Sequence, residues 1–246
     1  MSMSQADFRE AVLKTAGEAW WAEPCALKDW LEQGPEPHGA RVFALEHTVF
    51  AAHFPQWFGN LVANCPDLAA RRYMIENMYV EEVEDPTIHD NHLESMIKFG
   101  IGLGLSRDEI VSYSPSITMV MAIHYWDNAA RTKHWLEGFA AVGGLELTNS
   151  GELAARYGGT PINSRVHWAK LRLGEEHLTH WEAGEAADQG TGGHGDETIR
   201  ILVEYARSED LQQRALAALR ESLEVFRYQY DITGRMAFAA SGRQAP

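Results

Sequence analysis

The segment at residues 39–64, which contains ARVFALEHTVFAAHFPQWFGNLVAN, most constrains the fold of this chain. This apolar run is too long for a β-strand, so it predicts a long buried α-helix. Pro55 lies within it and predicts a kink, because proline lacks the backbone N–H that would bond to the preceding turn. The fold must therefore accommodate at least one long apolar helix.

Helical patterns account for most of the remaining chain, and no segment is a convincing strand. Residues 88–104 follow a period of 3.6, and residues 210–240 carry apolar side chains along one stripe. We predict a single all-α domain over residues 1–246, with disordered tails at 1–5 and 241–246. The expected helices are residues 7–21, 23–31, 39–64, 67–85, 88–104, 106–111, 117–142, a short one ending at 157, 163–187, 197–207 and 210–240, and residues 188–195, DQGTGGHG, form a low-complexity loop.

The charge balance excludes some classes of partner. The formal net charge is −14, whereas nucleic acids and anionic membranes both select basic surfaces. Two cysteines, Cys25 and Cys65, are too few for a disulfide framework or a thiolate zinc site. The sequence has no signal peptide pattern and no apolar stretch of about 18 residues. We therefore expect a cytoplasmic protein that binds neither nucleic acid nor membrane.

Residues 171–186, LRLGEEHLTHWEAGEA, concentrate carboxylates and imidazoles in a helix-forming run. On an α-helix, which turns about 100° per residue, Glu176 lies about 40° from His180 and His177 about 60° from it. All three side chains would then point into one cavity, as metal ligands do. A solvated acidic face with two surface histidines is the alternative. Interspersed apolar side chains argue against it, because ionisable groups on a buried helix need partners or a metal.

Two other polar groups belong with this cluster. An acidic string at residues 81–85 precedes His92, and Glu146 stands isolated between two helix breaks. Non-haem iron is held by imidazole and carboxylate groups with positions left open for oxygen, and a helical bundle supplies such ligands from several helices. The spread over three helices fits that requirement, although the acidic string could also be a solvated helix end.

Four segments of the chain resemble the haem-oxygenase-like superfamily, which includes pyrroloquinoline-quinone synthase, the thiaminase-II group and the haem-oxygenase-like di-iron oxidases. They are ANCPDLAARR at residues 63–72, ENMYVEE at 76–82, NHLESMIKFGIGLGLSRDEI at 91–110 and RALAALRESLEVFRYQYD at 214–231. The resemblance covers most of the chain and implies an all-α, single-domain haem-oxygenase-like helical bundle. The di-iron oxidases are the most similar branch.

The resemblance also implies a set of iron ligands. Glu81 and His92 match the first Glu and the His of the di-iron oxidase pattern, and a third ligand maps onto Glu146. The last family motif, His-x-x-x-Asp-x-x-His, corresponds to residues 173–180, LGEEHLTH, in which His180 matches. The predicted metal ligands are therefore Glu81, His92, Glu146, Glu176, His177 and His180.

The same motif departs from the family pattern at two positions. Leu173 stands where a His is expected, and His177 stands where an Asp is expected. Leucine cannot bind a metal, whereas neutral imidazole can, and Glu176 offers a carboxylate one residue away from His177. The number of iron ions, zero, one or two, therefore stays open at this point.

The function implied by the resemblance is an O2-dependent oxidoreductase that acts on a small organic molecule, such as an amino-acid derivative, in a biosynthetic pathway. The expected cofactor is non-haem iron, the expected catalytic residues are His177 and His180, and we expect a homodimer. One alternative is a cofactor-free oxidase that resembles pyrroloquinoline-quinone synthase, in which histidines transfer protons. Another is a non-catalytic helical binding protein with a degenerate site.

Overall fold

The computed structural model describes residues 1–188 and 193–246, which form an all-α fold. The only extended pairing in these ranges is an isolated bridge between Asp85 and Asp90. The all-α prediction is therefore confirmed. The helices are α1 Gln5–Ala16, α2 Ala26–Glu32, α3 Pro37–Asn64, α4 Leu68–Glu82, α5 His92–Gly102, α6 Arg107–Val111, α7 Ile117–Thr132, α8 Trp135–Val142, α9 Gly151–Tyr157, α10 Arg165–Trp168, α11 Thr179–Asp188, α12 His194–Tyr205 and α13 Glu209–Ala240, with a π-helix η1 at Gly17–Trp21 and 3₁₀ turns η2 Gly143–Asn149, η3 Ala169–Leu171 and η4 Glu175–His177.

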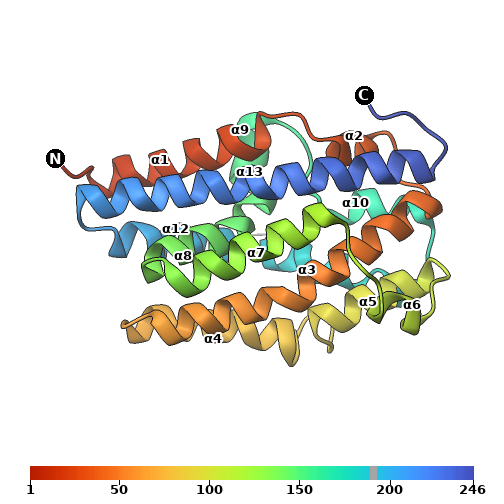
Figure 1. The fold of residues 1–246 in the computed structure, drawn as a ribbon, viewed down its shortest axis with the longest axis horizontal. Coiled ribbons are helices and arrows are strands. Elements are labelled where there is room, and N and C mark those ends of the chain that lie inside the picture. Colours follow the sequence, from red (N-terminus) through yellow and green to blue (C-terminus); the bar gives the residue numbers. More distant parts are fainter. Residues whose placement is uncertain (189–192) are drawn as a thin grey trace.

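Two long helices, α3 and α13, organise the bundle. Figure 1 shows α13 running the length of the molecule beside α1 and α3 crossing the middle. Helix α4 lies at the bottom of this view, on the side of α3 away from α13. Helix α13 packs against α1, α2, α3, α7 and α8, and α3 packs against α4, α5, α7 and α8. The long apolar segment at residues 39–64 is thus a buried helix, as predicted, and it continues through Pro55.

Two predicted helices are shorter than expected because local side chains cap new ends. The predicted helix at 117–142 breaks at Lys133, whose backbone is extended, and the imidazole of His134 then accepts a hydrogen bond from the backbone N–H of Leu136 to start α8. The predicted helix at 88–104 starts only at His92, because the Asn91 side chain caps its first turn. This second end places His92 at the first position of α5.

The prediction of one helix over residues 163–187 is wrong. Arg172 has a left-handed backbone, with φ of 56°, and Gly174 is extended. Non-glycine residues adopt the left-handed region rarely, and there they end a helix. The segment is therefore divided into α10, two short turns, η3 and η4, and α11.

The chain ends and the loop at residues 188–195 are described only in part. Residues 189–192 of the predicted loop at 188–195 lie outside the described residues, and His194 already belongs to α12. The backbone N–H of Met3 donates to the Gln212 side chain. The single domain and the disordered tails stay predictions. In the described part of the chain, no helix is both long and apolar enough to cross a membrane.

Helices α2 and α13 approach so closely that only glycine fits at Gly234. A Cβ atom there would lie 2.1 Å from the backbone nitrogen of Leu27. We therefore expect Gly234→Ala to destabilise the fold by about 2 kcal/mol, the usual cost of overpacking a core, and to lower Tm by about 4–8 °C. Thermal unfolding measures this effect. Gly151→Ala is the control, because a Cβ at Gly151 meets open space, and an equal loss in both variants would contradict the packing argument.

Candidate functional site

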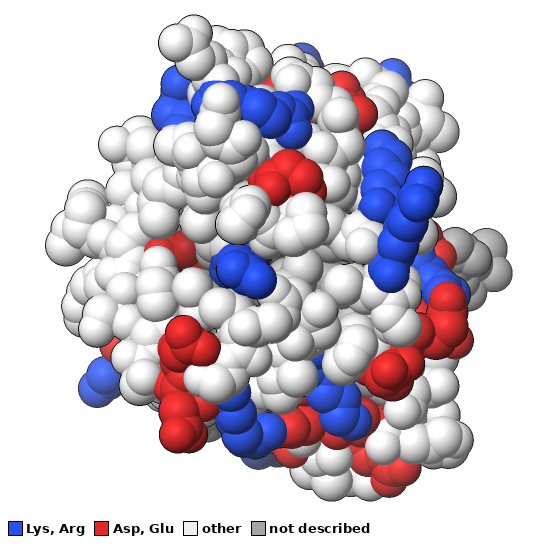
Figure 2. All heavy atoms as spheres, turned by 90° about the vertical axis from the view of Figure 1, so that its right-hand side faces the viewer, with Lys and Arg blue, Asp and Glu red and all other residues white. Residues whose placement is uncertain are grey.

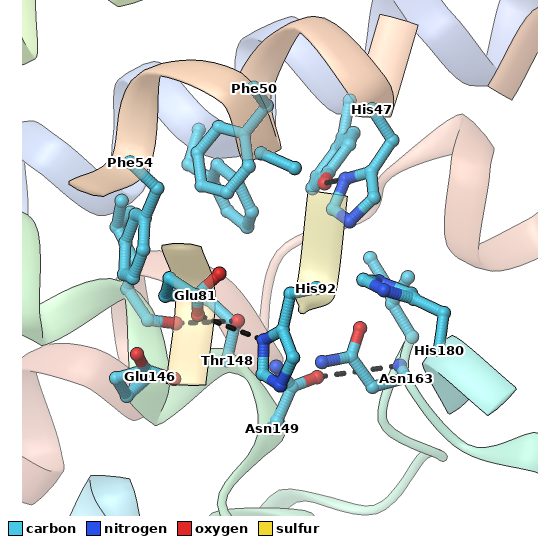
Figure 3. A pocket seen from close by; sticks show the side chains of 15 residues that line it. His47, Phe50, Phe54, Glu81, His92, Glu146, Thr148, Asn149, Asn163 and His180 are labelled. Atoms are coloured by element: carbon cyan, nitrogen blue, oxygen red, sulfur yellow. Dashed lines mark hydrogen bonds and ion pairs between the residues drawn. The ribbon is translucent and has the colours of Figure 1, made fainter. Parts of the chain in front are cut away.

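A cavity of about 80 Å³ lies in the middle of the bundle. Helices α3 and α13 form one wall, and α4, α5, α11 and the η2 turn form the other (Figure 3). Its lining combines aromatic rings with ionisable groups, which is typical of a substrate site. The lining residues are His47, Phe50, Ala51, Phe54, Glu81, His92, Leu145, Glu146, Thr148, Asn149, Ile162, Asn163, His180, Phe226 and Tyr230.

His92 lies between two carboxylates. Its Nδ1 atom is 3.0 Å from Glu81 Oε1, and its Nε2 atom is 2.9 Å from Asp85 Oδ2. All three side chains are buried. Burial alone would lower the pKa of His92, but the charge of Glu81 and the hydrogen bonds to both carboxylates raise this pKa to about 10. In this arrangement His92 is an imidazolium that donates from both ring nitrogens.

Asp85 is fixed by the connection between α4 and α5. Its Oδ1 atom accepts a hydrogen bond of 2.7 Å from the backbone N–H of Thr87, and its own backbone N–H donates to the carbonyl of Asp90. Burial alone would raise the pKa of Asp85, but the hydrogen bond from His92 brings it to about 2. The tight connection therefore presents Asp85 to His92 from the side away from the cavity.

Glu146 reaches the same cavity from the η2 turn. Its side chain is 14% exposed, and its Oε1 atom is 4.0 Å from the Nδ1 atom of His194. Burial raises the pKa of Glu146, and the nearby charge of Glu81 raises it further. Two carboxylates, Glu81 and the largely buried Glu146, thus face one small space, an arrangement that a cation would stabilise.

His180 and His47 complete the ionisable lining. The Nδ1 atom of His180 is 3.1 Å from Ser95 Oγ, and the Nδ1 atom of His47 is 2.7 Å from the Tyr230 hydroxyl. Burial lowers the pKa of both rings, to about 3 for His47, so both are neutral near pH 7. The centroids of the two rings are 5.5 Å apart.

The structure brings together four of the six predicted metal ligands. Glu81, His92, Glu146 and His180 all line the cavity. Glu176 is on the surface, with 74% of its side chain exposed, and the Nδ1–H of His177 donates to the backbone carbonyl of Lys98. The expectation that Glu176, His177 and His180 share one cavity is therefore wrong. Its cause is the left-handed Arg172 and the separate turn η4, which remove the helical register that the argument assumed.

The sequence does not predict several polar residues of the site, among them Asp85, His47 and Tyr230. Asp85 belongs to the acidic string that the sequence does single out, and its position seven residues before His92 is the only available signal. His47 and Tyr230 lie on the two longest helices, on faces that read as apolar stripes. Only the packing of α3 against α13 brings them together, so sequence spacing could not pair them.

The donor types around the cavity fit iron. Two imidazoles and two carboxylates line one space, which is the ligand chemistry of non-haem Fe(II) sites. The side chain of Asn77, one helical turn before Glu81, is buried beside the carboxylate of Glu146. In the described residues no three ligating side chains already converge on one point. Iron binding therefore requires His92 to lose one proton and to exchange a carboxylate contact for the metal.

Residues 41–227 match a family described as iron-containing redox enzymes. Among curated proteins, pyrroloquinoline-quinone synthase of Acinetobacter baylyi is 27% identical over 76% of this chain and 68% of its own length. The 4-aminobenzoate synthase of Chlamydia pneumoniae is 30% identical over 34% of this chain, and the match spans only 36% of that enzyme. A haem-oxygenase-like domain of unknown function from Shewanella denitrificans has a TM-score of 0.73 at 13% identity, covering 98% of this chain and 97% of its own.

The buried contact between Asp85 and His92 predicts a measurable loss of stability. We expect Asp85→Ala to lower the free energy of unfolding by about 2 kcal/mol, because it removes a hydrogen bond to a buried charged group. Denaturant titration of the protein without added metal measures this change. Asp127→Ala is the control, because Asp127 pairs with Arg131 on the surface, where such pairs contribute about 0.5 kcal/mol. Equal losses in the two variants would contradict the assigned role of the buried contact.

Proposed function

Because the chain belongs to the family of iron-containing redox enzymes and has a haem-oxygenase-like fold, we propose that it is an O2-dependent oxidoreductase that acts on a small organic molecule. The central cavity is the proposed active site, and non-haem iron is the proposed cofactor. A biosynthetic role is part of the proposal, with an amino-acid derivative as one possible substrate. The names of the two curated relatives, both synthases, support a biosynthetic role.

The observation that carries this proposal is the composition of one cavity wall. Glu81, His92, Glu146 and His180 come from four separate elements, yet they line one buried space. Burying ionisable groups without a ligand or partner destabilises a protein. Such clusters are therefore more typical of active sites than of structural cores.

In the proposed enzyme these four residues hold the iron, which would supply redox chemistry with O2 beside the substrate. The opposite wall has a different task. Phe50, Phe54 and Phe226 present apolar rings to the cavity and exclude water from it. Water exclusion strengthens the electrostatic interactions within the site. Of the two histidines predicted as catalytic, we retain His180, whereas the surface position of His177 makes it a control.

A second candidate is cofactor-free oxidation. It is favoured by the state of His92, an imidazolium held between Glu81 and Asp85 at the cavity wall. A fixed acid of this kind could donate a proton to a substrate without any metal. The match to pyrroloquinoline-quinone synthase over 76% of the chain also supports this candidate.

The predicted partners follow from the same proposal. We propose a small-molecule substrate and O2 as partners, and the homodimer and the cytoplasmic location stay predictions. Figure 2 shows one end of the molecule, where lysine and arginine side chains stand in small groups between acidic ones. This face lacks the continuous basic patch that a phosphate backbone selects, which agrees with the net charge of −14.

Iron binding is the first test of the proposal. We expect the full-length protein to bind Fe(II), and His180→Ala to weaken binding by more than about 100-fold, because losing a ligand costs more than losing an outer hydrogen-bond partner of one. Anaerobic titration with metal analysis measures the affinity, and circular dichroism checks the fold. His177→Ala is the matched control, three residues earlier in the chain and outside the cavity. Unchanged affinity in folded His180→Ala would refute the ligand assignment.

Metal removal separates the two candidate mechanisms. We expect a screen of small amino-acid-derived molecules to reveal one that stimulates O2 uptake, and a strong chelator to abolish that uptake because iron is required. Restoring Fe(II) should restore the rate. If protein shown to be iron-free by metal analysis consumes O2 at the full rate, the iron mechanism is wrong and the cofactor-free oxidase replaces it.

A further inference from the structure

The hydroxyl of Ser95 fixes which nitrogen of His180 carries its proton. Ser95 Oγ lies 2.7 Å from the backbone carbonyl of His92, which can only accept. The single hydroxyl hydrogen must therefore point to that carbonyl. Ser95 Oγ is then an acceptor toward His180 Nδ1, 3.1 Å away, so His180 carries its proton on Nδ1. The Nε2 atom of His180 is left with a bare lone pair.

The hydroxyl of Tyr230 fixes His47 in the opposite state. Tyr230 is 1% exposed, and His47 Nδ1 is the only hydrogen-bond partner of its hydroxyl in the described part of the chain. A buried hydroxyl hydrogen needs an acceptor, so Tyr230 donates to Nδ1. Neutral His47 must then carry its proton on Nε2. The Nε2 atom of His47 is therefore a hydrogen-bond donor, whereas the Nε2 atom of His180 is an acceptor.

Packing holds both rings in place at the cavity. The His47 ring stacks on Phe43 with 5.0 Å between centroids and on Phe50 with 5.5 Å. The His180 ring stands at 88° to Trp181, with 4.7 Å between centroids. Figure 3 shows His47 on the aromatic wall and His180 across from it, with the rings facing the same space. The hydrogen bonds to Tyr230 and Ser95 both use the Nδ1 atoms of these rings.

We propose that His47 and His180 form a complementary pair that orients the substrate. The Nε2–H of His47 donates a hydrogen bond to an acceptor oxygen of the substrate. This oxygen lies beside the atom that binds to the lone pair of His180 Nε2. The pair therefore selects a small molecule with a carbonyl, carboxylate or hydroxyl oxygen. Its apolar part lies against Phe50, Phe54 and Phe226. A group that only donates can pair with His180 Nε2, but it leaves the N–H of His47 without an acceptor.

The proposal rests on the proposed function for the identity of the site, and it makes His47 a specificity-determining residue. The two claims are separable. The proton positions are set by Ser95 and Tyr230 whether or not iron is present, and His47 is not among the proposed iron ligands. The size of the cavity, about 80 Å³, is smaller than the roughly 150 Å³ of a cavity that binds benzene. The group that enters between the two histidines is therefore small.

The first experiment reads the proton positions directly. Nitrogen chemical shifts of the histidine side chains, in full-length protein without added iron, should show His47 protonated on Nε2 and His180 on Nδ1. Tyr230→Phe should convert His47 into a mixture of both forms, and Ser95→Ala should do the same for His180. Tyr125→Phe, whose hydroxyl lies elsewhere in the bundle, should change neither ring. His47 protonated on Nδ1 in the wild-type protein would overturn the proposal.

The second experiment measures binding of 2-butanone, a small apolar molecule with one acceptor oxygen, by nuclear magnetic resonance titration. His47→Phe should weaken binding about fivefold, the usual value of one hydrogen bond. Tyr230→Phe, which keeps the imidazole, should weaken it less. His53→Phe, on the same helix but outside the cavity, should bind as wild type does. Equal affinity in all four folded proteins would overturn the proposal.

Measurements of Fe(II) affinity distinguish a failure of the orienting pair from a failure of the iron mechanism. His47→Phe should retain the iron affinity of the wild type, because His47 is not a ligand. If the wild type binds no iron but the histidine proton positions are as stated, the iron mechanism fails and the orienting pair stands. If iron binds and the proton positions are reversed, the orienting pair fails and the iron mechanism stands.

Discussion

The imidazolium of His92 between Glu81 and Asp85 is the interaction on which the cavity depends. A single charge at this depth would be strongly unfavourable, and a cation between two anions is tolerated because each ring N–H has a carboxylate acceptor. The contact also joins three pieces of backbone, the end of α4, the connection after it and the first residue of α5. Glu81 and His92, which belong to the proposed active site, therefore also fix the angle between α4 and α5.

The other groups of the site are positioned by interruptions in helices rather than by helices themselves. Glu146 lies in the η2 turn, and His180 lies one residue inside α11, just after the left-handed Arg172 and the η4 turn. A continuous helix would carry its side chains past a small cavity at a fixed pitch. Short turns allow neighbouring elements to present side chains at one point, although each turn leaves backbone groups that need other partners.

This dependence on interruptions explains what the sequence could and could not predict. The long apolar run that became α3 and the stripe that became α13 were predicted because periodicity reports burial directly. Glu81, His92, Glu146 and His180 were named from a family resemblance, and all four line the cavity. Glu176 and His177 depart from the family pattern, and the helical geometry that groups them with His180 fails once Arg172 turns the backbone.

The His47–Tyr230 contact shows a different limit of sequence reasoning. These residues lie 183 positions apart and meet only because α3 packs on α13. Each looks like one more ring in an aromatic stripe, yet together they place one polar N–H in an otherwise apolar wall. Because the facing His180 has its proton turned away toward Ser95, the two walls differ in hydrogen-bonding character at their closest approach. A ligand can satisfy both walls only in one orientation, so the buried hydroxyls of Ser95 and Tyr230 set the direction in which a substrate lies in the cavity.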